Sequence, residues 1–249
     1  MTEAEPVELS IDETIEILRP VLPDDSLVLV GGQALNYWLA FYRASDARLA
    51  MLAGVTSSDV DFLGSRESVN RIAAALRGTV KIEEPRAPTL AAVRFIDRNG
   101  HERIIDFLRQ VYGLDEQRVR ATAVPVETRD EAGSPSGVEL KILHPVLCLE
   151  SRTHNVHGLE GYQTPRALRQ LTAAVGCARA YIVACCDRGD IRAAHDAIRV
   201  IGDLACSEPG RSVFIMQSID VLEAIPDDAR LGDAFSSQNL PTIRQRAGR

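Results

Sequence analysis

The sequence predicts an α+β fold, a mixed β-sheet with flanking helices, followed by a C-terminal helical bundle. Two observations lead to this prediction. Between residues 26 and 143, short apolar runs of strand type alternate with helical stretches. From His144-Pro145 to about residue 225, only helical patterns remain. We therefore expect an α+β domain over residues 1–143, a helical domain over 144–226 and a flexible polar tail over 227–249.

The first elements have clear boundary signals. Ser10 and Glu13 form a capping box, and apolar residues follow at helical spacing as far as residue 22. SLVLVGG (26–32) is a short apolar run that ends in two glycines. QALNYWLAFYRA (33–44) resumes with helix formers and aromatic residues. Residues 26–44 are therefore expected to form a strand, a Gly-Gly turn and a helix.

Further strands are expected along the rest of the first domain. DVDFLG (59–64) is a strand, and Ser65 caps a helix whose apolar face runs to Leu76, with Gly78 just past its end. Arg98-Asn99-Gly100 is a hairpin signal between two later strands. The other expected strands are 79–84, 89–98, 101–111, 120–128 and 137–143.

Composition excludes some classes of protein. The 249 residues carry a net charge of −7, which disfavours binding to nucleic acid through bulk charge. No run of about 18 apolar residues is present, so no membrane span is expected. The five cysteines are odd in number, and most fall in apolar helical stretches. This pattern is typical of reduced core thiols, and we expect a cytoplasmic protein.

Two aspartates in the 59–64 strand are the strongest chemical signal. Alternate side chains of a strand share a face, so Asp59 and Asp61 point the same way. Adjacent carboxylates repel unless a cation lies between them, and hard divalent ions prefer oxygen ligands. Asp106, within RIIDFL on a later strand, is the third candidate ligand. Taken singly, the aspartate pair also fits a solvated strand edge, and Asp106 fits a partner for Arg103 or Arg109.

The glycine pair offers a second feature. Gly31 and Gly32 end a strand and open a helix, which leaves backbone N–H groups and the positive helix end facing an anion. Because glycine has no side chain, a triphosphate could also come close to the main chain at this turn. A tight turn without a ligand is the alternative interpretation of the same pair.

Taken in their order along the chain, the glycine pair, the two aspartates of one strand and the later strand aspartate resemble the motifs of the nucleotidyltransferase superfamily related to DNA polymerase beta. The resemblance is closest to AbiEii-type toxins and minimal nucleotidyltransferases, and lies in LVGGQAL (29–35), SSDVDFLG (57–64) and IIDFL (104–108). It implies a nucleotidyltransferase-like mixed sheet and two Mg²⁺ ions, with Mn²⁺ as the alternative. Asp59 and Asp61 would be metal ligands, and Asp106 a ligand that also helps to deprotonate the acceptor.

The resemblance also implies residues that bind the nucleotide. Relatives often carry a serine after the first glycine of the turn, whereas here Gly32 and Gln33 follow Gly31. AbiEii-type toxins use a lysine beyond the sheet, for which Lys141 is the candidate, and Arg152 or Arg169 would be its substitute as the phosphate contact. The expected nucleotide-binding residues are Gly31, Gly32, Gln33, Ser57, Ser58, Lys141 and Arg152.

The expected function is transfer of a nucleoside monophosphate from an NTP to a hydroxyl of a tRNA, a protein or a small molecule. In a toxin–antitoxin system, an antitoxin partner would also be expected. A catalytically idle relative that acts as a binding or regulatory module is the first alternative. A glycosyltransferase with a metal-binding Asp-x-Asp is the second, and it is disfavoured because only 58 residues precede Asp59.

Overall fold

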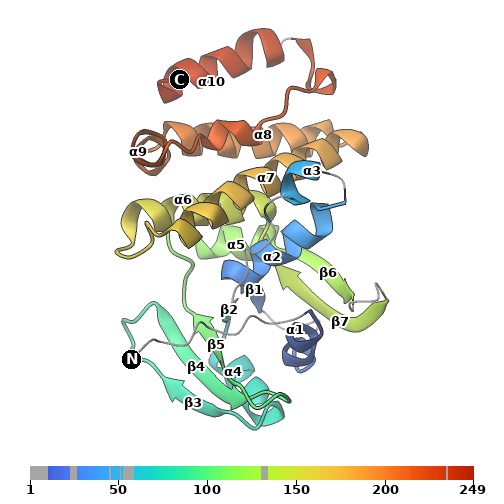
Figure 1. The fold of residues 1–249 in the computed structure, drawn as a ribbon, viewed down its shortest axis with the longest axis vertical. Coiled ribbons are helices and arrows are strands. Elements are labelled where there is room, and N and C mark those ends of the chain that lie inside the picture. The colour runs from blue at the N-terminus through green and yellow to red at the C-terminus, as the bar shows by residue number, and fades with distance from the viewer. Residues whose placement is uncertain are drawn as a thin grey trace. The chain divides into compact units, whose positions relative to one another are not determined.

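The computed structural model describes residues 11–22, 27–44, 46–50, 52, 59–129, 134–233 and 235–249. The chain divides into two compact units, shown in Figure 1. The first combines residues 1–36 with 56–144, and the second combines 37–55 with 145–249. Residues 37–55 differ from the predicted division, which includes them in the first domain. They belong to the second unit, where the buried side chain of Leu49 lies next to Gly176.

The first unit is built on a mixed sheet of seven strands within the described residues. The strand order is β3-β4-β5-β2-β1-β7-β6 (Figure 1). The strands are β1 (Val28–Val30), β2 (Val60–Leu63), β3 (Thr79–Ile82), β4 (Thr89–Ile96), β5 (Glu102–Leu108), β6 (Val124–Arg129) and β7 (Pro135–Ile142). The helices are α1 (Ile11–Leu18), the start of α2 (Gly31–Tyr42), α4 (Arg66–Ala75) and α5 (Glu116–Thr122).

Strand β2 is the central strand of the sheet, and the strand directions are mixed. Strand β2 is antiparallel to β1 and parallel to β5, while β1 is parallel to β7. Strands β3, β4 and β5 form an antiparallel meander, and β6 and β7 form a hairpin. The predicted α+β class is confirmed at this level.

One face of the central strands forms the apolar core of the first unit. Val60, Phe62, Ile105 and Phe107 are almost fully buried and alternate with more exposed positions. Helix α4 packs against β3 and β4, and α1 packs against β7. Ser65 caps α4 by accepting a hydrogen bond from the Ser68 amide, as predicted. The alternation directs the polar residues of β2 and β5 to the opposite face.

The second unit is helical within the described residues. Helices α6 and α7 pack against each other, and α7 packs against α8. The four-residue helix α3 contacts α7. The elements are α3 (Ala47–Ala50), α6 (Pro145–Gly158), α7 (Pro165–Asp187), α8 (Ile191–Cys206), α9 (Glu208–Gln217), η1 (Val221–Ala224), η2 (Ala229–Leu231), η3 (Phe235–Asn239) and α10 (Leu240–Ala247).

Three details differ from the sequence prediction. Both glycines of the expected turn lie inside the first turn of α2, which begins at Gly31. Residues 120–122, expected to begin a strand, are the last residues of α5, and the strand begins at Val124. The expected flexible tail contains η2, η3 and α10, and its Leu231, Phe235 and Ala247 are buried. Arg249 also pairs with Asp220 at 3.2 Å, which links the last residue of the chain to the segment before η1.

The sequence also predicts no membrane-spanning helix. No helix in the described ranges combines the length and the apolarity that crossing a membrane requires.

Candidate functional site

Asp61 and Asp106 lie side by side on neighbouring strands. Strands β2 and β5 are parallel, and Asp61 is the Cα partner of Asp106 in the register. The flanking pair, Phe62 and Phe107, points to the opposite face, where the rings stack with centroids 5.8 Å apart. Because this apolar pair fixes the pleat of both strands, the two carboxylates share the other face of the sheet.

Asp59 lies immediately before β2 and is exposed. Its negative charge acts on Asp106, which is half-buried. Burial raises the pKa of the Asp106 carboxyl, and the charges of Asp59 and Glu83 raise that pKa further. Arg94 opposes this effect and lowers the same pKa. The net result is a pKa of the Asp106 carboxyl above its ordinary value.

Gly31 and Asp61 are in direct contact. A Cβ added to Gly31 would overlap Oδ2 of Asp61 and would lie 2.8 Å from its Cγ. Gly31 also has φ +63, in the left-handed region that favours glycine. Strand pairing accounts for the contact, because Val30 is the Cα partner of Asp61 and Gly31 follows Val30 directly. The predicted glycine and the predicted aspartate thus belong to one site.

The start of α2 contributes backbone donors to this site. Helix α2 begins at Gly31, so the first N–H groups of the helix lack intrahelical acceptors and carry partial positive charge. Gly32 and Gln33 are buried in this turn. Oε1 of Gln33 accepts a hydrogen bond from Nδ2 of Asn36 at 3.4 Å, which assigns that side chain a structural role within α2.

Lys141 lies on the same face of the sheet as the aspartates. On β7 it is the Cα partner of Val28, and Val28 is the partner of Leu63 on β2. Leu63 follows Asp61 by two residues, so both side chains point to one face. Lys141 is half-buried, whereas Leu140 and Ile142 on either side are buried in the core. This register brings a cation to the carboxylate face.

The other predicted nucleotide-binding residues belong to other parts of the chain. Ser57 and Ser58 lie outside the described residues. Arg152 belongs to α6 in the second unit, where it is buried and its Nη1 donates to Oε1 of Gln170 at 3.1 Å. Glu83 and Arg94 were not predicted. In the sequence, each is a charged residue within a β-strand pattern. An exposed strand edge produces the same pattern, so the sequence does not identify them as site residues.

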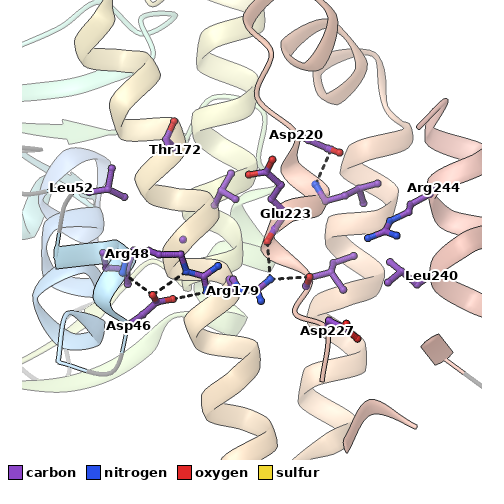
Figure 2. Close-up of a pocket in the computed structure, with 15 residues that line it drawn as sticks. Asp46, Arg48, Leu52, Thr172, Arg179, Asp220, Glu223, Asp227, Leu240 and Arg244 are labelled. Carbon is purple, nitrogen blue, oxygen red and sulfur yellow. Dashed lines mark hydrogen bonds and ion pairs between the residues drawn. The ribbon is translucent and has the colours of Figure 1, made fainter. Parts of the chain in front are cut away.

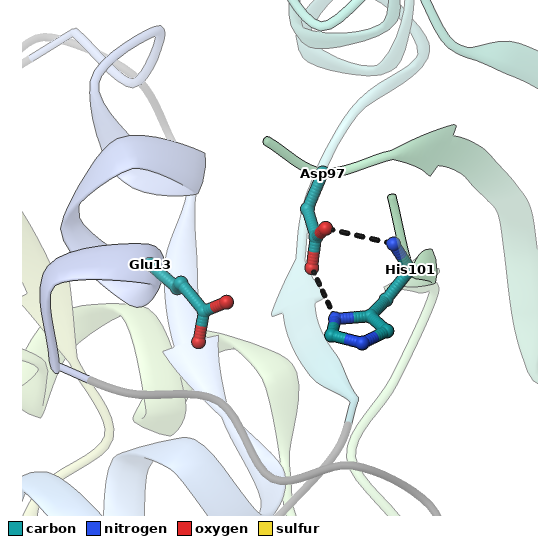
Figure 3. A group of neighbouring side chains, drawn as sticks. All are labelled: Glu13, Asp97 and His101. Carbon is teal, nitrogen blue, oxygen red and sulfur yellow. Dashed lines mark hydrogen bonds and ion pairs between the residues drawn. The ribbon is translucent and has the colours of Figure 1, made fainter. Parts of the chain in front are cut away.

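A different group of side chains has the spacing of a metal site. Among the described residues, only Glu13, Asp97 and His101 bring three ligand atoms within 4.8 Å of one another (Figure 3). Glu13 comes from α1, and the other two residues come from the turn between β4 and β5. The atoms of Asp59, Asp61 and Asp106 do not all meet this spacing.

A cation of the protein already lies within this group. Nε of Arg103 donates to Asp97 at 2.7 Å, and Nη2 of Arg103 lies 3.6 Å from Glu13. Asp97 also accepts hydrogen bonds from the amides of Asn99 and His101. These donors hold the pKa of the Asp97 carboxyl, despite its burial, below its ordinary value. Arg103, Asp97 and Glu13 therefore form buried ion pairs that join α1 to the β4–β5 turn, while His101 is exposed.

The face around Asp61 combines three features of distinct origin. It has carboxylates from two strands, the two glycines that begin α2 and a lysine from a third strand. Carboxylate oxygens suit a hard divalent ion, and the helix start suits an anion. No protein-family model matches the chain, and no curated protein or solved structure matches it.

Proposed function

We propose that the chain is a Mg²⁺-dependent nucleotidyltransferase, which moves a nucleoside monophosphate from an NTP to an acceptor hydroxyl. One observation carries the proposal: Asp61 lies in register with Asp106 and also packs against Gly31 at the start of α2. A carboxylate in this place joins a cation-binding face to an anion-binding helix end. Transfer from an NTP requires both functions next to each other.

The donor set fits a divalent metal. Asp59, Asp61 and Asp106 offer oxygen ligands only, the type that Mg²⁺ prefers. The raised pKa of Asp106 arises partly from the charge of Asp59, and a cation between the two would relieve that repulsion. When bound, the metal would neutralise charge on the phosphates and align the hydroxyl with the leaving pyrophosphate.

The chain's own groups would bind the nucleotide and move the proton. The N–H groups at the start of α2 would hold phosphate oxygens, with Lys141 as a further cation. The acceptor oxygen forms a bond to the α-phosphorus, and the bond from that phosphorus to pyrophosphate breaks. Asp106 would accept the proton of the attacking hydroxyl, since a carboxylate with a raised pKa is a stronger base than an ordinary one.

One observation favours a second candidate function, a binding module of the same fold without catalysis. The three aspartates do not bring their ligand atoms within 4.8 Å of one another. A chain that binds NTP without transferring the nucleotide would need the helix start and the lysine but not the converged carboxylates. The two functions differ in whether a label moves from the NTP to an acceptor.

The experiment incubates the protein with each α-³²P-labelled NTP and Mg²⁺. Separate samples contain total RNA, a protein extract or a fraction of small hydroxylated molecules. Label is expected on one acceptor class and should be absent with Asp61→Asn. Asp196→Asn, at an exposed residue of α8, serves as the matched control and should retain transfer. Transfer by Asp61→Asn at the wild-type rate would contradict the site. NTP binding without any labelled acceptor would favour the binding module.

A further inference from the structure

The second unit contains a cavity of about 640 Å³ (Figure 2). Its walls come from α3 and the residue before it, from α7, from the segment around η1 and from α10. This volume lies within the range of small-molecule sites, which hold ligands of roughly 300–1,000 Å³. The lining mixes guanidinium groups, carboxylates and aliphatic side chains.

Some of the charges that line the cavity are already paired. Arg48 and Asp46 form an ion pair at 3.1 Å. Asp220 pairs with Arg249 at 3.2 Å and accepts a hydrogen bond from the Leu222 amide. The charges of these four side chains are paired with one another, so we do not assign them to a ligand.

The other charges of the lining are available. Glu223, Asp227 and Arg244 are exposed, and none of them has an ion pair among the residues that the structure describes. In Figure 2, Arg244 projects from α10, while Glu223 and Asp227 come from the segment around η1. The cavity therefore presents two carboxylates and a cation from different elements.

Arg179 adds a fixed donor. Its Nη1 donates to the backbone oxygens of Glu223 and Ile225, at 3.2 and 3.1 Å. Its Nε is shielded from solvent and has no hydrogen-bond partner in the described part of the chain. This N–H group has no surface that a ligand in the open cavity could reach, so Arg179 contributes by holding the segment around η1 against α7.

Aliphatic side chains fill the space between the charges. Leu52, Val175, Ile225 and Leu240 all contribute to the lining. An ordinary nucleotide would place its phosphates against four carboxylates, and a purely cationic ligand would meet three guanidinium groups. The lining fits a molecule with one charge of each sign and an apolar body.

We propose that this cavity binds a small zwitterion with an apolar body, a free α-amino acid or a short peptide. Glu223 and Asp227 receive its ammonium group. Arg244 receives its carboxylate. The site is separate from the carboxylate face of the first unit, and the inference does not depend on nucleotidyl transfer.

Calorimetry with the full chain tests the proposal, with L-leucine and L-leucyl-L-leucine as the probes. At least one of them is expected to bind, and the comparison distinguishes an amino-acid site from a peptide site. N-acetyl-L-leucine lacks the ammonium group and L-leucinamide lacks the carboxylate, so each should bind at least tenfold more weakly than L-leucine. The corresponding derivatives of the dipeptide serve the same purpose if the dipeptide is the ligand.

Two variants locate the site. Glu223→Gln and Arg244→Gln should each weaken binding at least tenfold, because each removes the partner of one ligand charge. Arg192→Gln, at an exposed residue of α8 outside the lining, should leave binding unchanged. Absence of binding by both zwitterions would overturn the proposal. Equal binding of the amide derivative, or wild-type binding by both site variants, would overturn it as well. The samples contain neither NTP nor Mg²⁺, so this outcome is independent of the outcome for nucleotidyl transfer.

Discussion

The carboxylate of Asp61 occupies the space that a side chain on Gly31 would need. Oδ2 of Asp61 would overlap a Cβ at Gly31, whose φ of +63 already favours glycine. Sequence positions 30 apart are thus locked together by the pairing of β1 with β2. This contact joins the proposed metal ligand to the proposed phosphate-binding helix end, so a change at one should disturb the other.

Gly31→Ala should therefore impair both stability and function. A non-glycine residue in the left-handed region costs about 1–2 kcal/mol, and the collision with Asp61 adds to that cost. We expect nucleotidyl transfer to fall by roughly 10²-fold, as displacement of a catalytic group by about 1 Å does. Thermal unfolding and the labelling assay measure the two effects.

Gly137→Ala is the matched control for this prediction. Gly137 has φ +72 and lies in the same unit, but a Cβ there would meet nothing within 4 Å. The control should show the backbone cost and retain transfer. If both variants lost activity equally, the contact between Gly31 and Asp61 would have no special role.

Asp106→Asn should stabilise the metal-free protein at neutral pH. The folded state raises the pKa of Asp106, so the carboxylate destabilises the fold above the unfolded-state pKa. That cost is fully present above the folded-state pKa and disappears as pH falls through it. The melting temperature of the variant should thus exceed that of the wild type at pH 7, and the difference should shrink at acidic pH.

Comparison with the variant isolates the effect of Asp106. Carboxyls with a lowered pKa, such as Asp97, stabilise the fold less as the pH falls. This loss is the same in both proteins, so it cancels when their melting temperatures are subtracted. Saturating Mg²⁺ should stabilise the wild type and not the variant. A difference that is independent of pH would show that the charge of Asp106 is not the cause.

Lys141→Met should raise the KM for NTP about tenfold and leave kcat less affected. The side chain supplies charge on the carboxylate face, where it would neutralise phosphate in the bound nucleotide. Lys141→Arg keeps the charge and should retain most of the affinity. Steady-state kinetics on all three proteins separates the effects. An unchanged KM in the methionine variant would exclude Lys141 from the nucleotide site.

Arg103→Met should destabilise the first unit by about 3–5 kcal/mol, since it leaves Glu13 and Asp97 buried without their cation. Arg98→Met is the control, because Arg98 pairs with Glu16 at an exposed position and should cost less than about 1 kcal/mol. Urea unfolding gives both values. A chelator should not lower the melting temperature of the wild type if Arg103 is the only cation of this cluster. A chelator-sensitive melting temperature that Glu13→Gln abolishes would instead identify a metal site there.

The central part of the fold could be predicted because local pattern and tertiary structure agree. Phe62 and Phe107 alternate with aspartates in both strands, and this alternation predicts two carboxylates on one face. The structure confirms that the two strands are neighbours. The contact of Asp61 with Gly31 could not be predicted, since it depends on the antiparallel register of β1 and β2.

Other features depend on contacts between residues far apart in the sequence. Helix α5 buries Val119 alone and so lacks a helical apolar period. In the C-terminal segment, Arg249 pairs with Asp220 and lies 3.8 Å above the ring of Phe214, and neither contact has a local sequence signal. The cavity between α7 and α10 likewise has no local sequence signal, because its charges come from separate elements.

The most direct test of the metal site is electron paramagnetic resonance with Mn²⁺ as the spectroscopic substitute for Mg²⁺. The protein would be titrated with Mn²⁺ in the presence of a non-hydrolysable NTP analogue, and the free Mn²⁺ signal would be recorded. We predict that the wild type removes Mn²⁺ from the free pool, whereas Asp61→Asn and Asp106→Asn do so at least tenfold more weakly. Equal Mn²⁺ binding by the wild type and both variants would contradict the metal site, and with it the proposed nucleotidyltransferase.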